Sequence, residues 1–72
     1  MKQELPNYTN EDMSALIDSI IHNKRARLVL KLRLCDHLTY AEIGDNPEVD
    51  RTERQVGYIL AKNIPILISH MK

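Results

Sequence analysis

The chain has few of the residues that interrupt helices or cross-link a fold, with two glycines, three prolines and one cysteine in 72 residues. A single cysteine excludes a disulfide within the chain, and the three histidines do not match a zinc-binding spacing. No run of about 18 apolar residues is present, and the first residues lack the apolar core of a signal peptide. We therefore expect a cytoplasmic protein with no membrane partner, metal or other cofactor.

The chain also lacks a net charge, because its ten basic residues balance its ten acidic ones. This removes the simplest argument for a nucleic-acid-binding protein, which is a strongly basic total. At 72 residues the chain is too short for two cores, and a domain of this size buries only about 60% of the surface that its unfolded form exposes. We expect one domain that is marginally stable or that forms a homodimer.

Apolar residues at spacings of three and four predict an all-α fold, a small domain of four helices. The expected helices cover 10–22, 24–37, 40–46 and 53–64, after a flexible tail at 1–9, so that the domain spans 10–72. Thr39 to Glu42 and Thr52 to Gln55 have the form of capping boxes, which open helices. Pro65 should kink, end or restart the last helix, because proline lacks a backbone donor.

The same spacing predicts which apolar side chains form the core. These are Leu16, Ile20, Leu28, Leu32, Cys35, Leu38, Ile43, Val56, Ile59 and Leu60. The apolar segment 64–71 should fold back on the first helix or pair with a second copy of the chain, because such a patch is rarely left in water.

Charge alternates in blocks, with basic residues gathered at 24–38 and 51–72 and acidic ones at 39–50. Such blocks are ordinarily solvated helix faces. In the last helix, however, Arg54 and Tyr58 lie opposite the apolar face, and Gln55 and Lys62 flank them. Arginine and glutamine contact base edges, whereas lysine and tyrosine suit phosphates. Gly57 on this helix would permit a close approach by another group.

From Ile20 onward the chain resembles the helix-turn-helix of sigma factor region four, and more closely a group of short phage and mobile-element proteins. Residues 27–44, a helix rich in Leu and Arg, a turn and then Thr-Tyr-Ala-Glu-Ile-Gly, are similar to the family pattern. His37 stands where the family has a turn glycine, and a positive φ angle is less accessible to it. The resemblance implies a recognition helix in the major groove, in which Arg51, Arg54, Gln55, Tyr58 and Lys62 read DNA.

The expected function is that of a sequence-specific double-stranded DNA-binding protein, a phage- or prophage-type transcriptional regulator. Candidate DNA-binding residues are Arg25, Thr39, Tyr40, Arg51, Thr52, Arg54, Gln55, Tyr58 and Lys62. The alternative is a helical protein–protein interaction module, a partner of a transcription or phage-packaging complex that binds RNA polymerase or another phage protein. We do not expect an enzyme, because Asp36 and His37 have no Ser or Cys nucleophile beside them.

Overall fold

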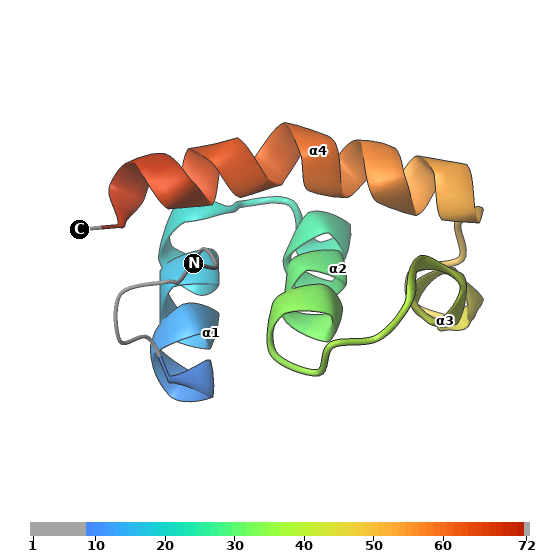
Figure 1. Ribbon diagram of the computed structural model, residues 1–72, viewed down its shortest axis with the longest axis horizontal. Coiled ribbons are helices and arrows are strands. Elements are labelled where there is room, and N and C mark those ends of the chain that lie inside the picture. The colour runs from blue at the N-terminus through green and yellow to red at the C-terminus, as the bar shows by residue number, and fades with distance from the viewer. Residues whose placement is uncertain (1–8, 72) are drawn as a thin grey trace, which may run out of the picture.

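A computed structural model describes residues 9–71 as an all-α fold, with four helices and no strand among those residues (Figure 1). The helices are α1 (Asn10–Ile20), α2 (Lys24–Leu34), α3 (Tyr40–Asp45) and α4 (Glu53–His70). The predicted number, order and starts of the four helices are confirmed. The predicted tail lies outside the described residues apart from Thr9, which caps α1.

Each helix begins at a side-chain cap, which explains why the chain turns where it does. The hydroxyls of Thr9, Thr39 and Thr52 each accept a hydrogen bond from the backbone N–H three residues later. The side chain of that third residue bonds back to the backbone N–H of the threonine, so all three are capping boxes. At α2 the side chain of Asn23 accepts from the N–H of Ala26 at 2.9 Å. The two predicted boxes are confirmed.

The first two helices end earlier than predicted, α1 at Ile20 and α2 at Leu34. After α2 the chain turns through His37, which has a φ of 60°. Histidine is one of the few residues besides glycine that are enriched in this left-handed region, so the expectation that His37 would avoid a positive φ angle is wrong. Arg33 holds the turn, since its Nη1 donates to the carbonyl of Leu38 at 2.9 Å.

The prediction that the last helix ends at residue 64 is wrong, because α4 continues through Pro65 to His70. Proline removes the N–H that would bond the carbonyl of Ala61. Both Pro65 and Ala61 are exposed, so the missing bond lies on the solvent side of the helix. The apolar C-terminal segment therefore reaches α1 by extending α4 rather than by folding back, and Leu67 is buried there (Figure 1).

The core lies where α4 crosses the other three helices (Figure 1). Of the predicted core residues, Ile43, Val56 and Leu60 are fully buried, and the other seven are half-buried around them. The buried set also contains Met13, Ile17, Ile21, Ala26, Val29, Leu30, Val49 and Leu67, which the prediction left out. Among the described residues, no helix has both the length and the apolar character needed to cross a membrane.

Candidate nucleic-acid interface

The first half of α4 has a buried face and an exposed face. Val56 and Leu60 are buried, whereas Arg54, Gln55, Tyr58 and Lys62 are exposed, and 69% of Tyr58 is accessible to solvent. The polar side chains therefore lie on the surface that the helical spacing predicted.

A hollow of about 300 Å³ lies between this face and the N-terminal end of α2, and we call it the minor hollow. It brings together Arg25, Arg51, Tyr58 and Lys62, which are four of the nine predicted residues. The remaining lining residues are Asn23, Ala26, Ile59 and Asn63. Three cationic side chains thus meet on one surface, although they come from different parts of the sequence and the chain as a whole is neutral.

The loop between α3 and α4 positions two of these arginines. Nε of Arg25 donates to the carbonyl of Val49 at 2.9 Å, and Nη1 of Arg51 donates to the carbonyl of Asp50 at 2.9 Å. A guanidinium group has five N–H donors, so each arginine keeps donors for a ligand. Arg25 is therefore both a structural residue and a candidate binding residue.

The loop has a fixed conformation because its backbone is bonded internally. The carbonyl of Asn46 accepts from the N–H groups of Val49 at 2.9 Å and Asp50 at 2.8 Å, and Oδ1 of Asn46 accepts from the N–H of Glu48 at 2.8 Å. Val49 is buried, so it anchors the loop in the core. In the sequence, Val49 is a single apolar residue between two acidic ones, and this segment was interpreted only as acidic.

Gly44 is required where this loop returns to α3. A Cβ on Gly44 would lie 2.3 Å from the carbonyl oxygen of Arg51, and the N–H of Arg51 donates to the carbonyl of Gly44 at 3.3 Å. No other residue fits there without moving the backbone. This contact sets the position of Arg51 and of the first turn of α4.

Tyr40 lies outside the minor hollow. Its ring lies under the Arg33 guanidinium, 5.1 Å from the centroid, and a Cβ on Gly57 would lie 3.3 Å from its Cε2. The group that approaches Gly57 in this structure is therefore the Tyr40 ring. Tyr40 connects α2, α3 and α4 and remains 40% exposed.

Thr39, Thr52 and Gln55 are engaged in capping boxes and do not line the minor hollow. Oε1 of Gln55 accepts from the N–H of Thr52 at 3.1 Å and lies 3.3 Å from the Thr52 hydroxyl. A bidentate contact to adenine uses both the oxygen and the nitrogen of a glutamine amide. Gln55 would have to leave its cap to make that contact.

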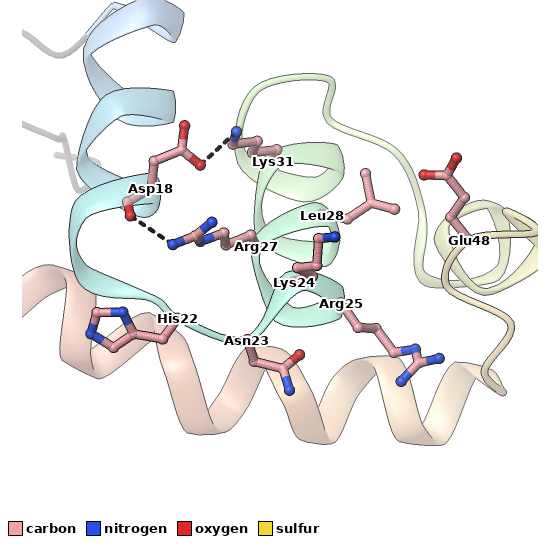
Figure 2. A pocket seen from close by; sticks show the side chains of 9 residues that line it. All are labelled: Asp18, His22, Asn23, Lys24, Arg25, Arg27, Leu28, Lys31 and Glu48. Carbon is pink, nitrogen blue, oxygen red and sulfur yellow. Dashed lines mark hydrogen bonds and ion pairs between the residues drawn. The ribbon is translucent and has the colours of Figure 1, made fainter.

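A second hollow, of about 760 Å³, lies between the C-terminal end of α1, α2 and Glu48 of the loop, and we call it the major hollow (Figure 2). Four cationic side chains line it, against the two carboxylates of Asp18 and Glu48. The four are Lys24, Arg25, Arg27 and Lys31, and His22, Asn23 and Leu28 complete the lining. Except for Arg25, these cationic residues were not predicted as site residues, because the basic block at 24–38 was interpreted as a solvated helix face. That basic block was the feature of the sequence that could have indicated the hollow.

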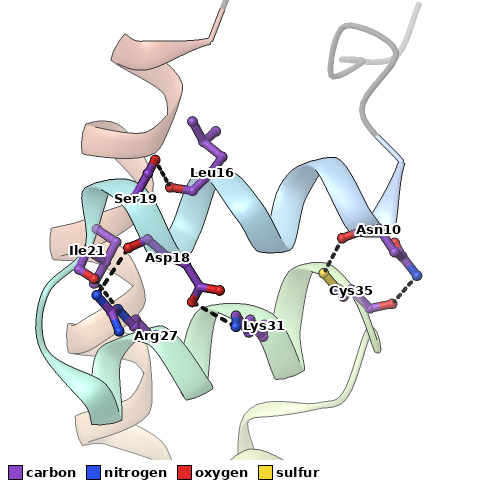
Figure 3. A network of polar contacts seen from close by, with 8 residues as sticks. All are labelled: Asn10, Leu16, Asp18, Ser19, Ile21, Arg27, Lys31 and Cys35. Carbon is purple, nitrogen blue, oxygen red and sulfur yellow. Dashed lines mark hydrogen bonds and ion pairs between the residues drawn. The ribbon is translucent and has the colours of Figure 1, made fainter.

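Two of these cations are engaged with α1 (Figure 3). Lys31 lies 2.8 Å from Asp18, and no other ion pair joins two residues of the part that the structure describes. The hydrogen bond from Lys31 lowers the pKa of Asp18 below its usual 3.8. Arg27 donates to the carbonyl of Ile21 and, at 3.1 Å, to that of Asp18. Lys24 has no such contact within residues 9–71.

Cys35 and the acidic residues give no sign of reaction chemistry. Cys35 is half-buried, its Sγ lies 3.6 Å from the carbonyl oxygen of Asn10, and partial burial raises the pKa of its thiol. A raised pKa disfavours the thiolate, which is the nucleophilic form. Across residues 9–71, no three His, Cys, Asp or Glu side chains are grouped as a metal site would need.

No family model matches the sequence, and comparison with curated proteins and with solved structures gives no match. The functional argument therefore depends on the two hollows and on the exposed face of α4.

Proposed function

We propose that the protein is a sequence-specific double-stranded DNA-binding protein, a phage-type transcriptional regulator of the cytoplasm, in which α3 and α4 act as a helix-turn-helix. The observation that carries the proposal is the minor hollow. Three cations and a tyrosine from α2, the loop and α4 meet there in a neutral chain. Convergent cations beside an exposed helix face form the electrostatic surface that a duplex requires.

In this proposal the first turns of α4 enter the major groove. Arg54 is fully available, because it makes no hydrogen bond or ion pair with another described residue, and its guanidinium matches the two acceptors of guanine. Lys62 and Tyr58 contact phosphates beside the groove, and Arg51 holds the phosphate nearest the start of the helix. Gln55 contributes a single donor while its oxygen remains in the cap.

The acidic loop limits indiscriminate binding. Asp45 ends α3, Glu48 and Asp50 lie in the loop that follows it, and the three carboxylates repel phosphates. Non-specific affinity comes almost entirely from phosphate contacts, so it is weak in such a protein. Base contacts by α4 then account for a large share of the binding at the preferred site.

The test compares Arg54→Ala with Lys62→Ala on a duplex selected from a random-sequence pool. Arg54→Ala should cost about 1–3 kcal/mol on the preferred duplex and relax the choice of one base pair. Lys62→Ala should weaken binding to every duplex similarly and lower the slope of log affinity against log salt by about one unit. Ala15→Ser, on an exposed residue of α1 that lines neither hollow, is the control. An Arg54→Ala variant that is folded and binds with undiminished affinity would show that α4 does not read DNA.

A protein–protein interaction module is the second candidate, and the C-terminal half of α4 favours it. Ile66 is 40% exposed and Ile68 is 55% exposed, and they stand on either side of the buried Leu67. The occupant would be RNA polymerase, another phage protein or a second copy of the chain. Such binding is insensitive to salt, whereas DNA binding is not, so a salt titration separates the two candidates.

A further inference from the structure

We infer that the major hollow binds the phosphodiester backbone of the same duplex, next to the segment that α4 reads. The inference rests on the proposed function and extends it to the N-terminal end of α2. It adds Lys24 to the DNA contacts and makes Glu48 an opposing charge at the rim of the contact surface.

The first argument is the local balance of charge. Lys31 already neutralises Asp18 at 2.8 Å. Of the other charged side chains, Lys24, Arg25 and Arg27 are positive and only Glu48 is negative. Arg25 and Arg27 use donors on backbone carbonyls, which leaves their positive charge in place. The hollow therefore favours an anion.

The second argument is continuity. Asn23 and Arg25 line both hollows, so the two surfaces join at the start of α2. Figure 2 shows Arg25 extending toward the loop and α4, away from Asp18. A backbone that contacts Lys62 and Arg25 therefore lies next to Lys24, and Glu48 is the carboxylate that opposes it there.

The third argument concerns the kind of anion. Taken together, the cations of the two adjoining hollows come from α2, the loop and α4, so they form a surface that extends beyond either hollow. A duplex strand presents a phosphate at each nucleotide, so it matches an extended series of cations. Half-buried Leu28 lies in the lining and gives the sugar between phosphates an apolar contact. An acidic protein segment is the alternative occupant, and the experiment below separates the two.

The test measures the salt dependence of binding for the whole chain on duplexes of about 10 and about 20 base pairs, one and two turns of B-DNA, centred on the preferred site. On the longer duplex, Lys24→Ala should lower the slope of log affinity against log salt by about one unit, and Lys24→Arg should keep it. Lys24 is the first residue of α2 and is exposed, so its loss leaves the fold intact. Glu48→Gln should strengthen binding, because it removes a repelling charge.

Thr9→Asp is the matched control. It changes the net charge by the same unit as Lys24→Ala, it is exposed, and it replaces one N-cap residue of α1 by another. Position 9 is nine residues before Asp18, about 13 Å along the helix, and it should leave the slope unchanged because charge interactions are screened over about 8 Å at physiological salt.

Two results would overturn the inference and leave the proposed function standing. In the first, the parent binds DNA and Lys24→Ala leaves the slope of log affinity against log salt unchanged. The other is a Lys24→Ala variant that loses affinity for polyglutamate and keeps its affinity for DNA, which would assign the hollow to an acidic protein. Failure of the parent to bind any duplex would instead refute the proposed function itself.

Discussion

The pair α1–α2 and the first half of α4 are both rich in polar side chains, but they use them differently. Between α1 and α2 the polar side chains bond to the fold, as in Lys31 to Asp18 and Asn10 Nδ2 to the carbonyl of Cys35 at 3.3 Å (Figure 3). On α4, Arg54, Tyr58 and Lys62 make no hydrogen bond or ion pair with another described residue. Basic blocks that look alike in the sequence therefore divide into a structural set and a set that is available to a ligand.

Arg25 stands between the two sets. It belongs to α2 and fastens the loop through Val49, but its remaining donors face the minor hollow with the free side chains of α4. The comparison thus predicts which substitutions reduce stability, which reduce binding, and which reduce both.

The largest expected effect is in the C-terminal half of α4, which contributes a buried side chain to the core. Leu67 is buried, so Leu67→Ala should cost about 2–5 kcal/mol of unfolding free energy, a large part of the stability of a domain this small. Its neighbour Ile68 is exposed, and Ile68→Ala should change stability by less than about 0.5 kcal/mol. Urea denaturation followed by circular dichroism measures both. Equal effects would mean that α4 does not pack on α1 beyond Pro65.

The two glycines provide the next test, because each lies at a different kind of contact. Gly44→Ala places a methyl group against the Arg51 carbonyl oxygen and should cost about 1–3 kcal/mol of unfolding free energy. Gly57→Ala meets only the partly exposed Tyr40 ring, which can shift, and gains up to about 1 kcal/mol of helix propensity. Thermal unfolding should therefore rank Gly57→Ala at or above the parent and Gly44→Ala well below it.

Local signals predicted the fold better than they predicted the packing. Capping boxes depend on residues three apart, so Thr39 and Thr52 located two helix starts correctly. The apolar stripe of α1 contains five residues. Their spacing alone did not show that Ile17 is the most buried of them, or that Leu16 and Ile20 lie at its sides. The passage of α4 through Pro65 depends on which side of the helix faces water, which is decided by tertiary contacts.

The candidate site followed the same rule. The exposed face of α4 came from helical spacing, whereas the approach of Arg25 to Tyr58 and Lys62 depends on how α2 packs against α4. The capping role of Gln55 was visible in the sequence. Its consequence, that the amide oxygen is already occupied, required the structure. The position of Lys24 in the lining of the major hollow was missed because a basic block is ordinarily a solvated face.

A smaller effect is expected at Arg25, where structure and binding meet. Arg25→Ala should lose about 1 kcal/mol of unfolding free energy, the low end for a charged hydrogen bond because the side chain is half-exposed. Arg25→Lys should lose similar stability, since it cannot reproduce the Nε bond to Val49, but it should keep the salt slope of DNA binding. Lys62→Ala should keep the unfolding free energy and lower the salt slope of DNA binding. Unfolding and binding measured on the same three variants decide whether Arg25 has both roles.

The smallest expected effect concerns Asp18, and its sign follows from its pKa. The bond from Lys31 lowers the pKa of the folded-state carboxyl below 3.8, so the folded protein holds this proton less tightly than the unfolded chain does. The ion pair therefore stabilises the fold above 3.8, and its contribution disappears as the pH falls through the lowered value. Because Asp18 is exposed, Asp18→Asn should produce only a slight loss at neutral pH and none in strong acid. Urea unfolding of the parent and the variant, at neutral pH and in strong acid, provides the measurement. A difference that persists in acid would mean that the substitution acts through something other than the charge of Asp18, because Asp18→Asn keeps the backbone carbonyl that Arg27 contacts.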